Sequence, residues 1–221
     1  MTQSQPDGFL ALPPAGTGRG VLVLHPWWGL NDTIKALCTR LADSGFAVFA
    51  PDLYHGKVAK TIPEAEVLGN ALDTNYQQAK IEVADAARFL SARAGQENSG
   101  LAVVGLSMGG FYALNLAATD PVTFRSVVLF YGTDGTMGTD FSKSKAEYLG
   151  HFAENDPYET QANVDDLEKR LKSAGRPVTF HRYKGTSHWF FEPDRTDAYN
   201  ATAASLAWDR TLAFLKRPSA S

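Results

Sequence analysis

A serine in a strand-to-helix turn is the residue of this chain best suited to do chemistry. Residues 105–109 read Gly-Leu-Ser-Met-Gly and stand directly behind an apolar run at 101–106. This G-x-S-x-G spacing puts the hydroxyl of Ser107 on a sharp turn, because glycine has no Cβ to clash where strand and helix cross. A neutral hydroxyl is a poor nucleophile, so the pentapeptide needs a base and an orienting acid elsewhere in the chain.

Two later residues meet that need in the right order. Asp156 follows a short apolar run at 148–152, and His188 lies in a Gly/Ser/Thr-rich loop after an apolar run at 178–183. Serine, then aspartate, then histidine is the order of α/β-hydrolases. We therefore expect Ser107 to attack a carbonyl, His188 to act as base and then acid, and Asp156 to orient His188. Glu154 is the competing acid, but Pro157 ends the strand and favours a turn at Asp156.

The remaining histidines do not form a second site in the sequence. His181 lies within a strand pattern and His151 ends a short one, so both are interpreted as structural. The five histidines are scattered, with no pair spaced i, i+4 and no cysteine cluster beside them. We expect neither a metal nor a cofactor.

Acyl transfer also needs donors for the developing oxyanion. The backbone N–H of Met108, at the start of a helix, is one expected donor, and that of Trp27, in the loop at 25–29, is the other. Trp28, Tyr54 and Trp189 are expected to contact the substrate. Core or lid packing is the alternative for every aromatic residue at these strand ends, a group that comprises Trp27, Trp28, Tyr54, Tyr131, Trp189 and Phe190.

Apolar runs alternate with helical patterns along the whole chain, which predicts a single α/β domain over 1–221 with a mostly parallel, doubly wound sheet. Asp32 is the expected N-cap of the first helix, and Gly45 its left-handed end. Residues 55–75 break the alternation and are expected to run over the carboxyl edge of the sheet. Residues 217–221 are expected to be a frayed tail. Strands are predicted at 21–25, 46–50, 101–106, 126–131, 148–152 and 178–183, and helices at 32–44, 76–94, 109–118, 160–174 and 198–215.

Composition narrows the class of partner. The chain has 221 residues, 44% of them apolar and 20% charged, with a net charge of −3. No basic cluster is present to bind nucleic acid, and no apolar run is long enough to span a membrane. The N-terminus has no secretory pattern, and Cys38 is the only cysteine, so a cytoplasmic location is expected. The expected partner is a small ester or lactone; a monomer and a homodimer both stay open.

Taken together, these segments resemble the dienelactone hydrolase family of α/β-hydrolases. The matching stretches are HPWWGLN at 25–31, APDLY at 50–54, VGLSMGG at 104–110, GHFAENDPY at 150–158 and GTSH at 185–188, with a final helix at 203–215. The resemblance implies the fold and the triad. Three positions depart from the founding enzymes: Ser107 stands for their cysteine, Pro26 for a glutamate, and Glu192 for an arginine that holds a substrate carboxylate.

These departures favour a neutral substrate over the anionic dienelactone. A serine does not need the glutamate that activates a thiol, and a carboxylate at 192 is expected to repel an anion. The sequence thus predicts a serine carboxylesterase of small neutral esters or lactones. The alternatives are a dienelactone hydrolase (carboxymethylenebutenolidase) that binds its anion with another cation, a non-catalytic binding module on this scaffold, and a peptidase.

Overall fold

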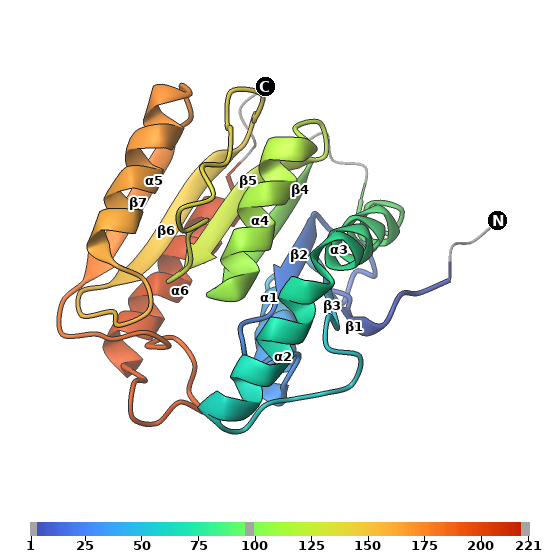
Figure 1. The fold of residues 1–221 in the computed structure, drawn as a ribbon. Helices are drawn as coiled ribbons and strands as arrows, with labels where there is room; N and C mark the ends of the chain where they lie inside the picture. Colours follow the sequence, from blue (N-terminus) through green and yellow to red (C-terminus); the bar gives the residue numbers. More distant parts are fainter. Residues whose placement is uncertain (1–3, 96–99, 218–221) are drawn as a thin grey trace.

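The computed structural model describes residues 4–95 and 100–217. Within them, one sheet has the strand order β1-β3-β2-β4-β5-β6-β7, in which β1 runs antiparallel and the others are parallel (Figure 1). The strands are β1 Gly8–Ala11, β2 Gly20–Leu24, β3 Ala47–Pro51, β4 Leu101–Leu106, β5 Phe124–Phe130, β6 Glu147–Ala153 and β7 Val178–Tyr183. The helices are α1 Asp32–Asp43, α2 Ile62–Thr74, α3 Tyr76–Ser91, α4 Met108–Thr119, α5 Gln161–Ser173 and α6 Ala201–Leu215.

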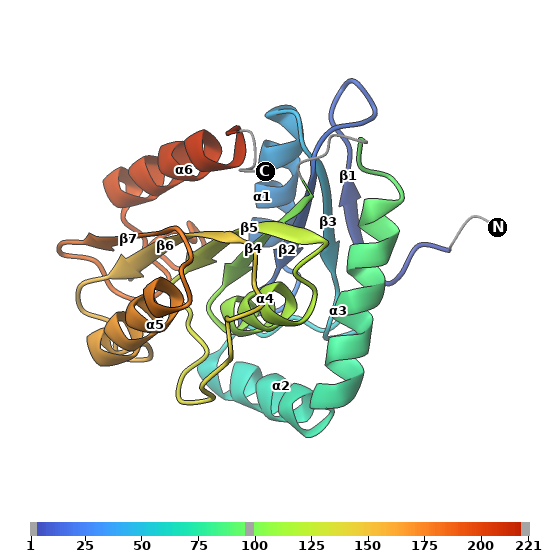
Figure 2. The ribbon, with the colours of Figure 1, turned by 90° about the horizontal axis from the view of Figure 1, so that it is seen from above.

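Helices cover both faces of the sheet. Seen along the strands, α1 and α6 lie on one face, and α3, α4 and α5 on the other (Figure 2). Strand β2 shows why its sequence has no polar alternation: Val21 and Val23 pack into the core under α1 and α6, and Leu22 and Leu24 into the opposite core. A strand buried on both faces needs apolar residues at every position, which is the pattern the sequence shows. The structure confirms the predicted α/β-hydrolase architecture.

Two local predictions need correction, and a third is confirmed. The antiparallel strand β1 was not expected, because four half-buried residues at the sheet edge give too short an apolar pattern. Asn31, not Asp32, caps α1, since its side chain accepts a hydrogen bond from the backbone of Ile34 at 3.0 Å. Gly45 does adopt a left-handed conformation after α1, with φ of 103°.

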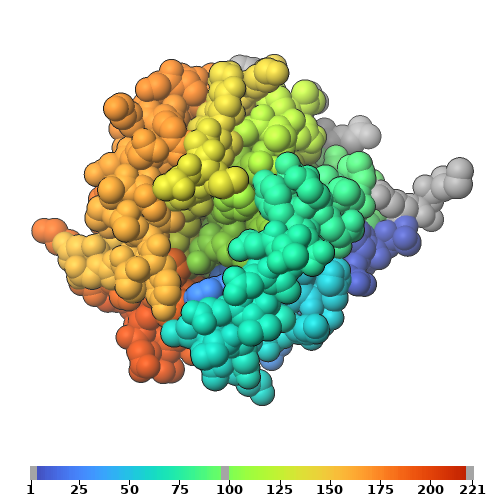
Figure 3. All heavy atoms as spheres, viewed as in Figure 1, coloured from blue at the N-terminus to red at the C-terminus, as the bar shows by residue number. Residues whose placement is uncertain are grey.

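The segment predicted to run over the carboxyl edge of the sheet contains a full helix. Thr61 and Glu64 form a capping box, in which each side chain accepts a hydrogen bond from the other's backbone, and this fixes the start of α2. The helix lies beside the carboxyl ends of the strands (Figure 1). Figure 3 shows a hollow in this face of the molecule, with α2 on one side and segments between β5 and α5 on the other.

Of the predicted frayed tail, residues 218–221 lie outside the described residues. Among the helices that the structure describes, none combines the length and the apolar character needed to cross a bilayer.

Two backbone segments pass very close to each other where α4 begins. A Cβ added to Gly109 would stand 2.1 Å from the carbonyl oxygen of Leu24 at the end of β2. No side chain fits there, so the glycine allows α4 to begin against β2.

Gly109→Ala should therefore destabilise the fold by about 1–3 kcal/mol, because the backbone of β2 would have to move. Chemical denaturation of the variant and of wild type measures the difference. Gly110→Ala is the matched control, since its Cβ would meet the backbone of Gly132 at 3.2 Å, a contact that small shifts relieve. Equal stability of the two variants would contradict this reading of the crossing.

Candidate active site

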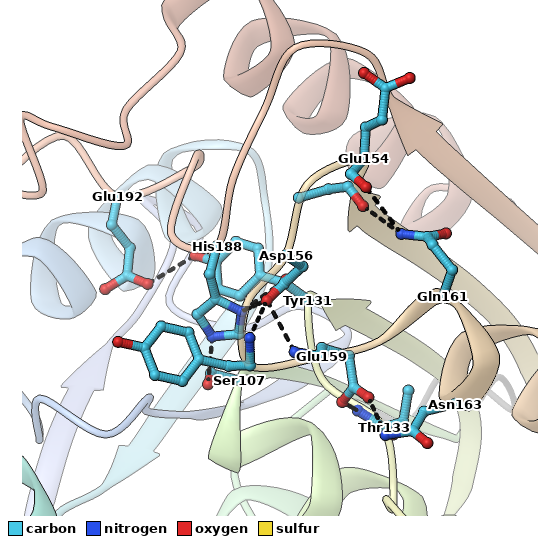
Figure 4. A network of polar contacts seen from close by, with 12 residues as sticks. Ser107, Tyr131, Thr133, Glu154, Asp156, Glu159, Gln161, Asn163, His188 and Glu192 are labelled. Atoms are coloured by element: carbon cyan, nitrogen blue, oxygen red, sulfur yellow. Dashed lines mark hydrogen bonds and ion pairs between the residues drawn. The ribbon is translucent and has the colours of Figure 1, made fainter.

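The three residues predicted as a triad converge at the carboxyl edge of the sheet, each from the end of a different strand. The Oγ atom of Ser107 lies 2.8 Å from Nε2 of His188, and Nδ1 of His188 lies 2.7 Å from Oδ2 of Asp156 (Figure 4). The side chains of His188 and Asp156 are only 3% and 2% exposed, so their interaction is shielded from water. These distances allow a proton to pass from the serine to the histidine while the carboxylate stabilises the imidazolium.

Ser107 is held in a strained backbone conformation. Its φ is 49° and its ψ −117°, a region that residues with a side chain rarely occupy. Its N–H donates to the carbonyl oxygen of Phe130 at 2.9 Å, which ties the turn to β5. Tyr131 and Trp189, which flank the site, also have positive φ, at 39° and 66°. Strain of this kind concentrates at functional sites, where the surrounding structure enforces it.

The acid is fixed by the turn that follows β6. The Oδ1 atom of Asp156 accepts hydrogen bonds from the backbone N–H groups of Tyr158 and Glu159, both at 2.9 Å. The side chain of Glu159 in turn accepts from the backbone of Thr133 and the amide of Asn163 (Figure 4). The competing acid, Glu154, accepts from the backbone of Gly185 and is not bonded to His188 in the part of the chain described.

A histidine that the sequence analysis left without a role orients one expected oxyanion donor. The N–H of Leu53 donates to Nε2 of His25 at 3.2 Å, so Nε2 is unprotonated and Nδ1–H donates to the carbonyl oxygen of Pro26 at 2.8 Å. Burial lowers the pKa of His25, which keeps this neutral form. In a trans peptide the C=O and N–H point in opposite directions, so fixing the carbonyl of Pro26 also fixes the N–H of Trp27.

The other expected donor, Met108, is the first residue of α4, where backbone N–H groups have no partner within the helix. Its Sδ atom accepts a hydrogen bond from the hydroxyl of Tyr54 at 3.6 Å. The crossing at Gly109 brings this helix start next to the end of β2, and so next to the loop that carries Trp27. The role of these two N–H groups as oxyanion donors stays a prediction.

The three residues predicted to touch substrate differ in exposure. Trp28 and Tyr54 are only 2% and 4% exposed, which leaves them little surface for a ligand. Both are therefore better explained as packing residues beneath the site, Trp28 against the ring of Trp189 at 5.1 Å. Trp189 is half-buried and lies 5.2 Å from the ring of His188. A residue that the sequence analysis did not select, Tyr158, is 46% exposed and lies 5.1 Å from the same ring.

Glu192 does not face the hollow as an anion. It is fully buried, and its Oε1 accepts a hydrogen bond from the hydroxyl of Tyr131 at 2.7 Å, as Figure 4 shows. The ring of Tyr131 packs on His188 at 4.8 Å between centroids. Oε2 of Glu192 has no hydrogen-bond partner among the described residues. Burial raises the pKa of Glu192 to about 8, so its neutral form predominates at pH 7.

Comparison with known proteins gives one consistent family. The model of the dienelactone hydrolase family matches residues 7–219. The chain belongs to the dienelactone hydrolase family. Protein usf from Aquifex pyrophilus is 31% identical, over 95% of this chain and 92% of that protein. A probable 2-oxo-3-(5-oxofuran-2-ylidene)propanoate lactonase from Bradyrhizobium sp is also 31% identical, over 92% of this chain and 86% of the lactonase.

Solved structures agree on the fold. A dienelactone hydrolase-like phosphotriesterase from metagenomic libraries superposes with a TM-score of 0.80 over 93% of this chain and 88% of that one, at 22% identity. As a dienelactone hydrolase family member, the protein is a hydrolase of esters or lactones.

The structure changes the meaning of one departure from the dienelactone hydrolase pattern. A repelling carboxylate was expected at Glu192, but a buried and mostly uncharged group does not repel a substrate. That expectation was wrong because position 192 was assumed to face the ligand. Glu192 is also not part of a metal site, since the described residues contain no cluster of three His, Cys, Asp or Glu side chains able to hold an ion.

The raised pKa of Glu192 makes stability depend on pH in a defined direction. The folded-state pKa, about 8, lies above the usual glutamate value of about 4.3, so the neutral form favours folding. The contribution of neutral Glu192 to the free energy of unfolding is fully present below about pH 4 and is lost as the pH rises through about 8.

Glu192→Gln removes this ionisation and keeps the shape of the neutral acid. Between pH 6 and 9 the free energy of unfolding of wild type should fall by roughly 2 kcal/mol more than that of the variant. Denaturation series at both pH values test this, with the exposed Glu66→Gln as the control. A pH dependence equal in wild type and Glu192→Gln would contradict it.

Proposed function

We propose that this protein is a serine esterase of small neutral carboxylic esters or lactones. The single observation that carries the proposal is the hydrogen-bonded line from Ser107 through His188 to Asp156. Oγ of Ser107 attacks the carbonyl carbon while its proton moves to Nε2 of His188. The protonated histidine then donates that proton to the leaving alkoxide, which leaves an acyl-enzyme.

In the second half of the reaction, His188 takes a proton from water, which attacks the acyl carbon. The same histidine returns the proton to Oγ of Ser107 as the acid product leaves. In both halves the N–H groups of Met108 and Trp27 stabilise the oxyanion, and each such donor is worth about 10²–10³ in turnover.

The neutral substrate class rests on the surroundings of His188. The rings beside it are those of Tyr131, Tyr158 and Trp189, which suit an apolar group. Near them, Arg195 stacks over the ring of Trp28 at 4.1 Å, and its guanidinium is bonded to Asp194 at 2.7 Å. A cation already paired in this way attracts an anionic substrate only weakly.

The alternative is a lactonase of anionic substrates, as the propanoate in the name of the Bradyrhizobium relative suggests. In that case Arg195 is the cation to test, because the structure places it against Trp28, in the aromatic cluster that adjoins His188.

Ser107→Ala should lower the hydrolysis of phenyl acetate by about 10⁴-fold or more, because no other group supplies the nucleophile. Circular dichroism should show an unchanged fold. A fluorophosphonate should label Ser107 in wild type and leave the variant unlabelled. Full activity in Ser107→Ala would contradict the assignment of the catalytic triad, and a failure to label wild type would favour a non-catalytic binding module.

A matched substrate pair should separate the two substrate classes. A carboxylate-bearing butenolide and its methyl ester have the same reacting lactone, and we expect the methyl ester to have the higher kcat/KM for opening of the lactone ring, with release of methanol measured separately. A preference for the anion that Arg195→Gln abolishes would establish the alternative. A short peptide in the same panel tests for peptidase activity, which should be absent.

A further inference from the structure

A glycine in the middle of α2 has a packing reason rather than a conformational one. Gly69 is buried in the helix, and its φ is not in the left-handed region, so alanine could adopt the same backbone. Glycine at such a position costs about 1 kcal/mol relative to alanine. A Cβ on Gly69 would stand 2.4 Å from Nε1 and 3.0 Å from Cδ1 of Trp27. The missing side chain is therefore the space that the indole occupies.

On the side of the active site, Trp27 meets a second ring. The ring of Tyr158 lies 6.1 Å away at an interplanar angle of 71°, an edge-to-face contact. Tyr158 in turn lies 5.1 Å from His188 and 5.0 Å from Trp189. A row of contacts thus runs from α2 through Trp27 and Tyr158 to the histidine that bonds Ser107.

We infer that Gly69 is a specificity-determining residue of the proposed esterase. Because Gly69 has no side chain, the indole of Trp27 packs directly against α2, and this leaves room beside His188 for a wide, flat ester group. The inference rests on the proposed function. A methyl group at position 69 pushes the indole away from the helix, and the ring that it then meets is Tyr158. Tyr158 is 46% exposed and has His188 and Trp189 on its other contacts, so crowding is passed to the space beside the histidine.

The predicted effect is selective. An ester that is narrow on both sides of the carbonyl, such as ethyl acetate, needs little of this space. Phenyl acetate and ethyl benzoate each carry a planar ring on one side and need it. Gly69→Ala should therefore lower kcat/KM for at least one of the two wide esters about tenfold relative to ethyl acetate, a change in activation free energy of about 1.4 kcal/mol.

Two further variants make the test specific. Asn70→Ala is the matched control, because it raises helix propensity at an exposed neighbouring position of α2 and should leave the ratio of wide to narrow ester unchanged. Trp27→Ala removes the indole and should raise that ratio for the same ester. Gly69→Ala added to Trp27→Ala should then have no further effect on it, since the ring through which it acts is gone.

The outcomes are distinguishable. A ratio unchanged by Gly69→Ala, or a loss that persists in the Trp27→Ala background, overturns the role of Gly69 while Ser107-dependent hydrolysis still supports the esterase. If wild type hydrolyses none of the three esters in a way that depends on Ser107, both the proposed esterase and the role of Gly69 are overturned. Where Gly69→Ala does not fold, the Trp27→Ala result decides alone, and a ratio that fails to rise overturns the inference.

Discussion

The crossing of β4, α4 and β2 at the nucleophile turn is the constraint on which the rest of the site depends. Gly105 and Gly109 leave no room for a Cβ there, because each would overlap a backbone carbonyl within 2.4 Å. That close approach gives Ser107 its strained φ, begins α4 at Met108, whose N–H has no partner within the helix, and brings the loop after β2 alongside. The base and the acid then need only stand at the ends of the strands beyond β5.

Strand ends could be predicted well because buried parallel strands and their turns leave local patterns. The order of Ser107, Asp156 and His188 could be predicted for the same reason. Pro157 favoured Asp156 over the competing acid Glu154. Long-range packing leaves no such pattern. The bond from His25 to Pro26 depends on Leu53, and the contact of Tyr158 with Trp27 joins segments that lie far apart in the sequence. Neither could be read from neighbouring residues.

Position 192 shows the same limit in electrostatic terms. A glutamate in the sequence suggests a charge, but its ionisation depends on burial that the sequence does not display. Here the side chain of Glu192 accepts a hydrogen bond from Tyr131, and the ring of Tyr131 packs on His188, so the acid supports the proposed catalytic base from behind. A neutral substrate is therefore favoured by the aromatic rings beside His188 and by the pairing of Arg195 with Asp194, and not by Glu192.

The packing of α2 has a consequence for how this scaffold can diverge. Ala65 of α2 packs in a small cluster with Trp28 and Ala59, whereas Leu72, toward the end of the helix, packs in one of the two cores that hold the sheet. Changes in that cluster alter what reaches the reacting atoms without disturbing the strands that hold the triad. Selection can thus change the Ala65 end of α2 while Leu72 keeps the helix anchored in the core, so new substrate preferences can arise there at little risk to the fold.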